Sequence, residues 1–296
     1  MNIFKNILCT LIDPRLFFRY QNYNVRLIYY LVLKILLFPM MIVRKRLIKK
    51  LKPFKVLNKI SKKKGYEFYD NKNVINLTLS AIKEAEDFYK NRNFQKSKKK
   101  YYFNLFEKNE ITQNSKILEL AKNKNILNTI TNYLGIFPVL TNISLWYTPK
   151  NKINLMKGSQ LFHLDHEDFK QVKCFVNCNN VNKNSGPLMV VNKLKSIKTQ
   201  KKINYKMNID SKRILGEKKY FSANDIFSFI GKKGSMLLVD TSNCFHCGGR
   251  STSGYRIMLS FQYITPYAFV KNLYKKRLFK DILNNSDIFE RNLSKF

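Results

Sequence analysis

The chain has 296 residues, 45% of them hydrophobic and 14% aromatic, which is enough to bury a sizeable core and excludes a disordered protein. Its formal net charge of +36, from 55 Lys and Arg against 19 Asp and Glu, would suit a nucleic acid or an anionic membrane. A coding bias toward Lys, Asn and Ile explains the same charge more simply. No aromatic and basic recognition motif accompanies it, so a nucleic-acid partner is not expected.

Residues 1–64 form a basic N-terminal segment with 16 Lys and Arg and one acidic residue. Within it, Leu27–Val43 is an apolar run of 17 residues, about the minimum length that crosses a bilayer as a helix. Lys34 at its centre opposes insertion, and Pro39 is expected to kink the helix. Three placements stay open: a helix lying in the membrane interface through residues 27–43, a buried helix packed on the rest of the protein, and a membrane anchor.

Residues 65–296 are predicted to form one folded domain, which begins with helices between residues 74 and 135. Apolar spacing predicts a helix over Asn76–Lys90 and a second over Ser115–Leu134. Ser115 can cap the second helix, and Gly135 can end it in the left-handed conformation.

Short strands with turn residues between them predict a β core over residues 139–266, arranged as a jelly roll. The expected strands are Val139–Tyr147, Gln160–Asp165, Gln171–Asn179, Leu188–Val191, Ser235–Asp240, Cys244–Cys247 and Tyr255–Ile264. Lys195–Ser222 is polar and lysine-rich, and we expect it to act as a lid. Residues 267–296 are expected to form a helical tail.

The pair His163 and Asp165 is the first chemical signal. Residues two apart on a strand point to the same face, so this imidazole and this carboxylate can reach one point. His246, one of only three histidines, can supply a third ligand from far along the chain. Two histidines and one carboxylate are the ligand set of non-haem iron(II) sites with open positions. Arg256, ten residues after His246, can clamp a dicarboxylic co-substrate in a bidentate fork.

Two stretches, residues 159–188 and 234–263, resemble the phytanoyl-CoA dioxygenase family. The similarity covers Ile117–Pro266, about half of the chain. It includes the H-x-D pair, an Asn184–Leu188 turn that is one residue out of pattern, the distal His246 and Arg256. The resemblance implies a mainly β fold with flanking helices, a double-stranded β-helix of the jelly-roll, cupin-like kind. It also implies iron(II) bound by His163, Asp165 and His246, with 2-oxoglutarate held by Arg256.

Other residues have both a functional and a structural interpretation. Lys173 is a second candidate for binding the co-substrate, or else a surface lysine. Tyr147, next to Trp146, is placed where the family lines its pocket, or else packs in the core. We expect His166 near the entrance of the site and Asp240 in a supporting turn.

The five cysteines are too few for a disulfide framework in a chain of this length, so we expect reduced thiols and a cytoplasmic location. Four of them could together bind a structural zinc ion. Burial as small apolar side chains is the simpler alternative. These four are Cys174, Cys178, Cys244 and Cys247.

The predicted function is therefore an iron(II)/2-oxoglutarate-dependent dioxygenase that uses dioxygen to hydroxylate a small-molecule or lipid-like substrate, resting on a membrane if residues 27–43 lie in the interface. The alternative is a non-catalytic barrel that binds anionic lipid or nucleic acid through its basic surface. The complete set of His163, Asp165, His246 and Arg256 favours the enzyme.

Overall fold

The computed structural model describes residues 15–51, 59–69, 72–92, 102–106, 110–150, 158–206, 219–269 and 287–294. Its strands are β1 (Tyr66–Tyr69), β2 (Phe103–Asn104), β3 (Val139–Thr148), β4 (Gln171–Asn177), β5 (Leu188–Val191), β6 (Ile226–Phe229), β7 (Met236–Val239), β8 (His246–Gly248) and β9 (Arg256–Ile264). Its longer helices are α3 (Tyr23–Leu36), α4 (Phe38–Leu51), α5 (Ile75–Lys90), α7 (Lys124–Leu134) and α8 (Lys193–Lys202), and the shorter ones are α2 (Arg15–Arg19), α6 (Lys116–Ala121) and α9 (Ile288–Ser294).

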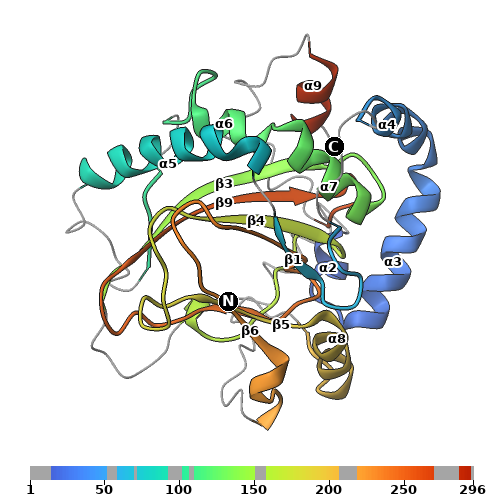
Figure 1. Ribbon diagram of the computed structural model, residues 1–296. Helices are drawn as coiled ribbons and strands as arrows, with labels where there is room; N and C mark the ends of the chain where they lie inside the picture. Colours follow the sequence, from blue (N-terminus) through green and yellow to red (C-terminus); the bar gives the residue numbers. More distant parts are fainter. Residues whose placement is uncertain are drawn as a thin grey trace.

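Two antiparallel sheets make up the β core. The larger has the strand order β1-β7-β4-β9-β3-β2, and the smaller has the order β6-β5-β8. Helices α5, α6 and α7 lie over the larger sheet, and the smaller sheet lies on its other side (Figure 1). This mainly β arrangement with flanking helices confirms the predicted fold class. Three short strands, β1, β2 and β6, were not among the predicted strands.

Both faces of the larger sheet are buried, which explains why its strands are apolar almost throughout. The outer face, toward the helices, carries alternate residues such as Leu145, Cys174 and Leu259 in the main core. The inner face, toward the smaller sheet, carries Phe175, Leu237 and other side chains of a separate cluster between the sheets. The inner face is the one that also carries the polar residues of the site.

The helix predicted over Ser115–Leu134 is two helices, α6 and α7. Ser115 caps α6 as expected, with its hydroxyl accepting a hydrogen bond from Leu118 N at 3.3 Å. The chain then breaks at Asn123, whose side chain accepts hydrogen bonds from the first N–H groups of α7. Gly135 ends α7 with φ of 76°, as predicted.

The apolar run Leu27–Val43 is also two helices rather than one. α3 ends at Leu36 and α4 begins at Phe38, with 82° between their axes. Pro39 lies in the first turn of α4, where its missing N–H leaves no hydrogen bond unmade. In the described part of the chain, no single helix is long and apolar enough to cross a bilayer, although this bent pair meets the criteria of length and composition when its two halves are taken together.

The inner sides of α3 and α4 are packed on the rest of the protein. Leu33 and Leu47 are buried in the main core. Arg26 is buried and donates to Asp168 O at 3.3 Å, and Arg44 is buried and donates to Phe137 O at 2.8 Å. The packed-helix alternative therefore holds for one side of each helix, while the other side is exposed.

The segment predicted as a lid does not cover the site in its described residues. It begins with α8, and then Tyr205 and Phe221 pack with Phe245 on the side of the smaller sheet that faces away from the larger one. Residues 207–218 of the segment lie outside the described residues. Of the predicted tail, residues 270–286 also lie outside them, and α9 is its described helix.

The four described cysteines are buried and form no disulfide, and they do not form a zinc site. Cys244 lies between the sheets, Cys247 lies on the opposite side of the smaller sheet, and Cys174 and Cys178 belong to the main core. Burial raises the pKa of the Cys178 thiol to about 12. Burial as small apolar side chains, the alternative to a zinc site, therefore describes these four cysteines.

Candidate metal centre

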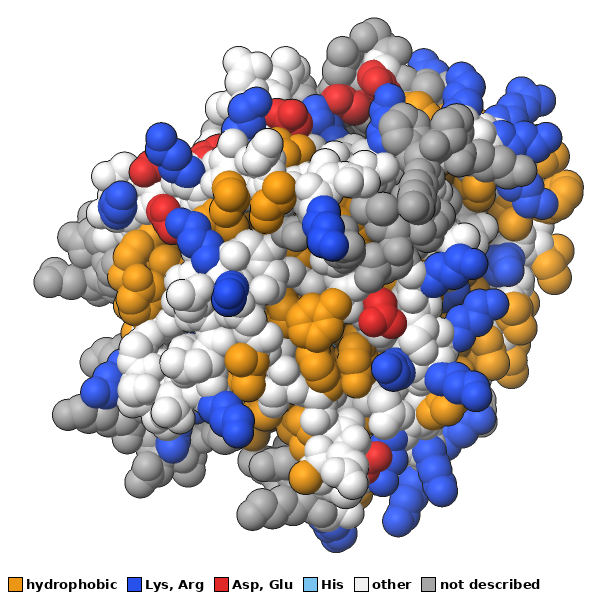
Figure 2. All heavy atoms as spheres, in the orientation of Figure 1, with side chains coloured by type: hydrophobic (Ala, Val, Ile, Leu, Met, Phe, Trp, Pro, Cys, Tyr) orange, Lys and Arg blue, Asp and Glu red, His pale blue; other side chains and the backbone are white. Residues whose placement is uncertain are grey.

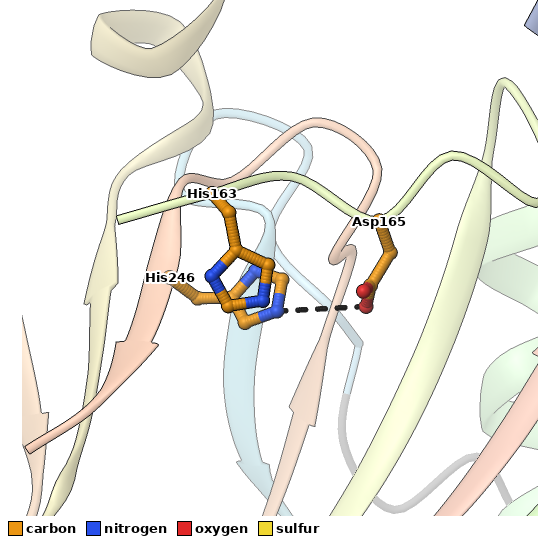
Figure 3. A group of neighbouring side chains, drawn as sticks. All are labelled: His163, Asp165 and His246. Carbon is orange, nitrogen blue, oxygen red and sulfur yellow. Dashed lines mark ion pairs between the residues drawn. The ribbon is translucent and has the colours of Figure 1, made fainter. Parts of the chain in front are cut away.

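His163, Asp165 and His246 come together at one point, as their spacing predicted. One ligand atom from each residue lies within 4.8 Å of the others. The strand predicted over Gln160–Asp165 is instead a short 3-10 turn that ends at Gln160, followed by extended chain. A single β-bridge joins His163 to His246, with N–H···O distances of 3.0 and 2.9 Å. Figure 3 shows the three side chains turned toward one another.

Both histidines present the same ring nitrogen to the centre of the group. Nδ1 of His163 lies 2.8 Å from Leu161 O, and Nδ1 of His246 lies 3.1 Å from Cys244 O. A carbonyl oxygen can only accept, so each Nδ1 carries the proton and each Nε2 keeps its lone pair for a metal. Burial is the main reason why the pKa of His246 is lowered, which favours the neutral form that a metal requires.

Asp165 is held as a carboxylate by its neighbours. Its Oδ2 lies 3.5 Å from Nε2 of His246 and 2.8 Å from Nζ of Lys173 on β4. Burial alone would raise the pKa of Asp165, but Lys173, His246 and His163 together hold it well below its usual range. Burial would lower the pKa of Lys173, and Asp165 raises it above its usual value. The structure thus brings Lys173 to the site.

A buried turn supports the metal-ligand loop. Asp165 N donates to Thr241 O at 2.9 Å. The preceding residue, Asp240, is fully buried and accepts hydrogen bonds from Tyr133 Oη at 2.6 Å and from Lys193 Nζ at 2.9 Å. Asn243 Nδ2 lies 3.1 Å from both carboxylate oxygens of Asp240. Asp240 is therefore bound within the turn, in the supporting position that was predicted.

Arg256 lies at the start of β9 with 1% of its surface exposed. Its Nη2 donates to Thr148 Oγ1 at 3.3 Å, while Nε and Nη1 are buried without a hydrogen-bond partner among the described residues. A buried guanidinium without an anion is costly, so this arrangement suits an incoming carboxylate. Burial lowers the pKa of Arg256 below its usual value, and an anionic ligand would restore it.

Gly248 places this guanidinium beside the strand of His246. A Cβ built on Gly248 would lie 3.1 Å from Nη2 of Arg256. Gly248 is two residues after His246 on β8, so its Cα and the His246 imidazole lie on the same side of the smaller sheet. The absence of a side chain at this position is what lets the guanidinium lie next to β8. Arg256 and the three metal-ligand candidates therefore share one interior.

Tyr147 does not lie in this interior. It lies on the outer face of β3, where its ring is 5.0 Å from that of Tyr89 on α5 and packs against the main core. Its neighbour Trp146 points to the inner face, and Trp146 Nε1 donates to Ser260 Oγ at 3.1 Å. The expectation that Tyr147 contacts the cofactor is therefore wrong. Alternate residues of β3 point to opposite faces, so Trp146, and not Tyr147, faces the interior.

His166 is fully buried, which corrects the expectation that it lies at the entrance. Its ring is 5.7 Å from that of Tyr205, and neither ring nitrogen has a hydrogen-bond partner in the described chain. Burial and the nearby Arg26 lower the pKa of His166 well below its usual value. His166 is not one of the residues that converge on the metal position.

Two residues of the site were missed from the sequence. The ring of Tyr102 stacks on that of Trp146, with the ring centroids 4.4 Å apart, and burial raises the pKa of its hydroxyl while Arg256 opposes the rise. Gln262 is paired with Lys173 across β9 and β4, and its Nε2 is buried without a partner among the described residues. Tyr102 directly precedes the two-residue strand β2, which is too short to show a periodic pattern. Gln262 could have been found from the sequence, because it lies an even number of residues after Arg256 on β9 and so points to the same face.

No protein-family model matches the sequence, and no curated protein matches it significantly. Solved structures do resemble the fold. The non-heme α-ketoglutarate-dependent epimerase SnoN from nogalamycin biosynthesis superposes with a TM-score of 0.50 and 12% identity, over 79% of this chain and 90% of SnoN. The chain shares the fold of SnoN. This similarity confirms the predicted double-stranded β-helix, and at 12% identity it establishes the fold alone.

Two further structures are similar at a lower level. EctD from S. alaskensis with bound Fe has a TM-score of 0.47 and 15% identity, over 74% of this chain and 76% of EctD. HygX from Streptomyces hygroscopicus, with nickel and 2-oxoglutarate bound, has a TM-score of 0.45 and 10% identity, over 69% of this chain and 84% of HygX. None of the three is named as a phytanoyl-CoA dioxygenase, so that resemblance stays a prediction.

Proposed function

We propose that the protein is an iron(II)- and 2-oxoglutarate-dependent oxygenase of the phytanoyl-CoA dioxygenase type, which hydroxylates a small-molecule or lipid-like substrate in the cytoplasm. One observation carries the proposal. His163, Asp165 and His246 converge in the same interior that holds the buried, partly unpaired guanidinium of Arg256. The fold shared with SnoN, itself described as α-ketoglutarate-dependent, supports the same class of chemistry.

The donor set fits iron(II). Two neutral imidazoles and one carboxylate leave a bound divalent ion with net positive charge and with positions open for a second, anionic ligand. Bound iron, with 2-oxoglutarate and dioxygen, would supply the oxidising chemistry, in which 2-oxoglutarate becomes succinate and carbon dioxide and one oxygen atom enters the substrate. His163 and His246 would hold the metal through Nε2, because each Nδ1 proton is directed to a backbone carbonyl.

The remaining residues would bind and orient the co-substrate. Arg256 would pair with the distal carboxylate of 2-oxoglutarate, using the nitrogens that now lack a partner. The apolar side chains between the sheets, among them Phe175 and Met258, exclude water from this interior. Water exclusion strengthens the pairing of Arg256 with an anion.

Turnover of 2-oxoglutarate without a substrate tests the proposal. Supplied with iron(II) and dioxygen, the protein is expected to release carbon dioxide slowly from 2-oxoglutarate. The His163→Ala protein is expected to release none, whereas Tyr147→Phe, on the outer face, should match the unmodified protein. Equal release by the unmodified and His163→Ala proteins would exclude this metal centre as the source of the activity.

The net charge of +36 favours a second candidate, a non-catalytic barrel that binds anionic lipid or nucleic acid. Such a protein would attach to vesicles or nucleic acid with a steep salt dependence. His163→Ala would leave that attachment unchanged, and no 2-oxoglutarate would be consumed. Comparison of the unmodified and His163→Ala proteins therefore separates the two candidates. The enzyme loses 2-oxoglutarate turnover in the variant, whereas the binding protein keeps its attachment to vesicles or nucleic acid.

A further inference from the structure

The outward sides of α3 and α4 form one exposed apolar surface. Its members are exposed by 42% to 75%, and those on α3 lie at positions i, i+3, i+4, i+7 and i+8, which is one face of a helix. They are Ile28, Leu31, Val32, Ile35, Leu36, Phe38, Ile42 and Val43. Hydrophobic side chains gather between Lys and Arg along the right-hand edge of Figure 2, where α3 and α4 lie in Figure 1. We call these eight residues the α3–α4 apolar surface.

The charges on the segment that carries this surface have one sign. Residues 15–51 contain nine Lys and Arg and no acidic residue. Past Val43, four basic side chains on α4 are exposed in turn: Lys45, Arg46, Lys49 and Lys50. An apolar surface next to such a basic row fits a partner that has an apolar interior and an anionic surface layer. Anionic lipid bilayers have this structure, with acyl chains below charged headgroups.

The buried sides of the two helices argue for shallow docking and against a membrane span. Arg44 donates to the carbonyls of Phe137, Pro138 and Asn292, and Arg26 donates to that of Asp168. Straightening α3 and α4 into a span would break all of these bonds and would carry two arginines toward the lipid. Unpaired carbonyl groups and charged arginine side chains are both costly inside a bilayer. The helices therefore stay on the protein and offer only their outward sides.

The charge also separates a bilayer from a second copy of the chain. A symmetric dimer through this surface would bring the basic row of each copy close to that of its partner, because a two-fold interface pairs the same patch with itself. Like charges at such an interface oppose association. Anionic headgroups would instead neutralise the same basic row.

We propose that the α3–α4 apolar surface docks the protein on the face of an anionic lipid bilayer, with the bend at Leu37 inserted most deeply. Ile35 and Leu36, exposed by 75% and 69%, lie at this bend together with Phe38. A docked helix pair of this kind reaches about 5–10 Å into the boundary between headgroups and acyl chains. The proposal is independent of the chemistry at the metal centre.

Co-sedimentation of the full chain with vesicles tests the proposal. The vesicles contain phosphatidylcholine, with or without phosphatidylserine, and are assayed at low and at high salt. The unmodified protein should sediment with the phosphatidylserine vesicles and should keep part of this binding at high salt, since burial of apolar side chains is not screened. Ile35→Glu should reduce the salt-resistant binding about tenfold, because it removes one aliphatic side chain that would be buried in the bilayer.

Leu79→Glu is the matched control. Leu79 is an exposed aliphatic residue on α5, away from α3 and α4, and its substitution changes the net charge by the same amount. It should bind vesicles like the unmodified protein, and both variants should unfold at the same temperature as that protein. Equal vesicle binding by Ile35→Glu and Leu79→Glu would overturn the proposal. A dimer in solution that Ile35→Glu converts to a monomer would overturn it as well, since the surface would then be covered by a second copy.

Discussion

Nζ of Lys173 lies 2.8 Å from Oδ2 of Asp165, so the carboxylate of the candidate metal centre is paired with an ammonium group. A divalent metal at this point would share Asp165 with a second cation. At 4 Å and an effective dielectric constant of 20, two unit charges interact by about 4 kcal/mol. The ion pair therefore lowers the affinity of the site for metal unless the lysine moves or an anion joins it.

Lys173→Met is accordingly expected to bind iron(II) more tightly, with the dissociation constant lowered by about tenfold, equivalent to 1.4 kcal/mol. Anaerobic equilibrium dialysis measures this constant. Lys195→Met is the control, because Lys195 pairs with Asp225 at 3.1 Å on a different part of the protein. Weaker iron binding by Lys173→Met would instead show that the ammonium group positions Asp165 for the metal.

Gly248→Ala is expected to weaken binding of 2-oxoglutarate while leaving iron bound. The added Cβ would lie 3.1 Å from Nη2 of Arg256, so the guanidinium must shift by a few tenths of an ångström. We expect an increase of about tenfold in the dissociation constant, and about a hundredfold for Arg256→Met, which removes the charged hydrogen bonds altogether. Titration calorimetry of the iron-loaded protein without oxygen measures both. Unchanged affinity in Arg256→Met would assign the distal carboxylate to another residue.

The pair Lys193 and Asp240 is expected to stabilise the turn before His246. Asp240 is fully buried, so Lys193→Met leaves its charge without the ammonium partner and should cost about 3–5 kcal/mol of unfolding free energy. The double variant Lys193→Met with Asp240→Asn should lose less than the sum of the two single losses. Urea unfolding of the four proteins measures the difference. Strictly additive losses would mean that the two residues act independently.

Gly186→Ala is expected to destabilise the protein more than Gly254→Ala. Both glycines have positive φ, 72° and 79°, which costs a residue with a side chain about 1–2 kcal/mol. A Cβ at Gly186 would also lie 2.5 Å from Gly249 O and 2.7 Å from Ser251 N, whereas nothing lies within 4 Å of one at Gly254. Of these two glycines, Gly186 is therefore the one held against the backbone of a neighbouring loop. Equal melting temperatures for the two variants would contradict this contact.

The sequence predicted the parts of the fold that repeat a simple rule. Alternation along a strand placed His163 and Asp165 on one side. The same rule puts Gln262 on the face of Arg256, although Gln262 was not among the predicted site residues. It could not say which side of β3 faces the site, because both faces of the larger sheet are buried and apolar. Tyr147 was therefore assigned to the wrong face. Pro39 predicted a kink in Leu27–Val43, and the chain bends close to it, at Leu37. The hydrogen bonds of Arg26 and Arg44 to carbonyls of distant segments could not be predicted, because they join parts of the chain that are far apart in the sequence.

Anomalous diffraction from crystals grown without oxygen in the presence of iron(II) tests the metal centre most directly. We predict one iron peak per chain, bounded by Nε2 of His163, Nε2 of His246 and a carboxylate oxygen of Asp165. The Asp165→Ala protein, crystallised in the same way, should show no peak there. An iron peak at any other place, or one that persists in Asp165→Ala, would contradict the assignment of these three residues as the ligands.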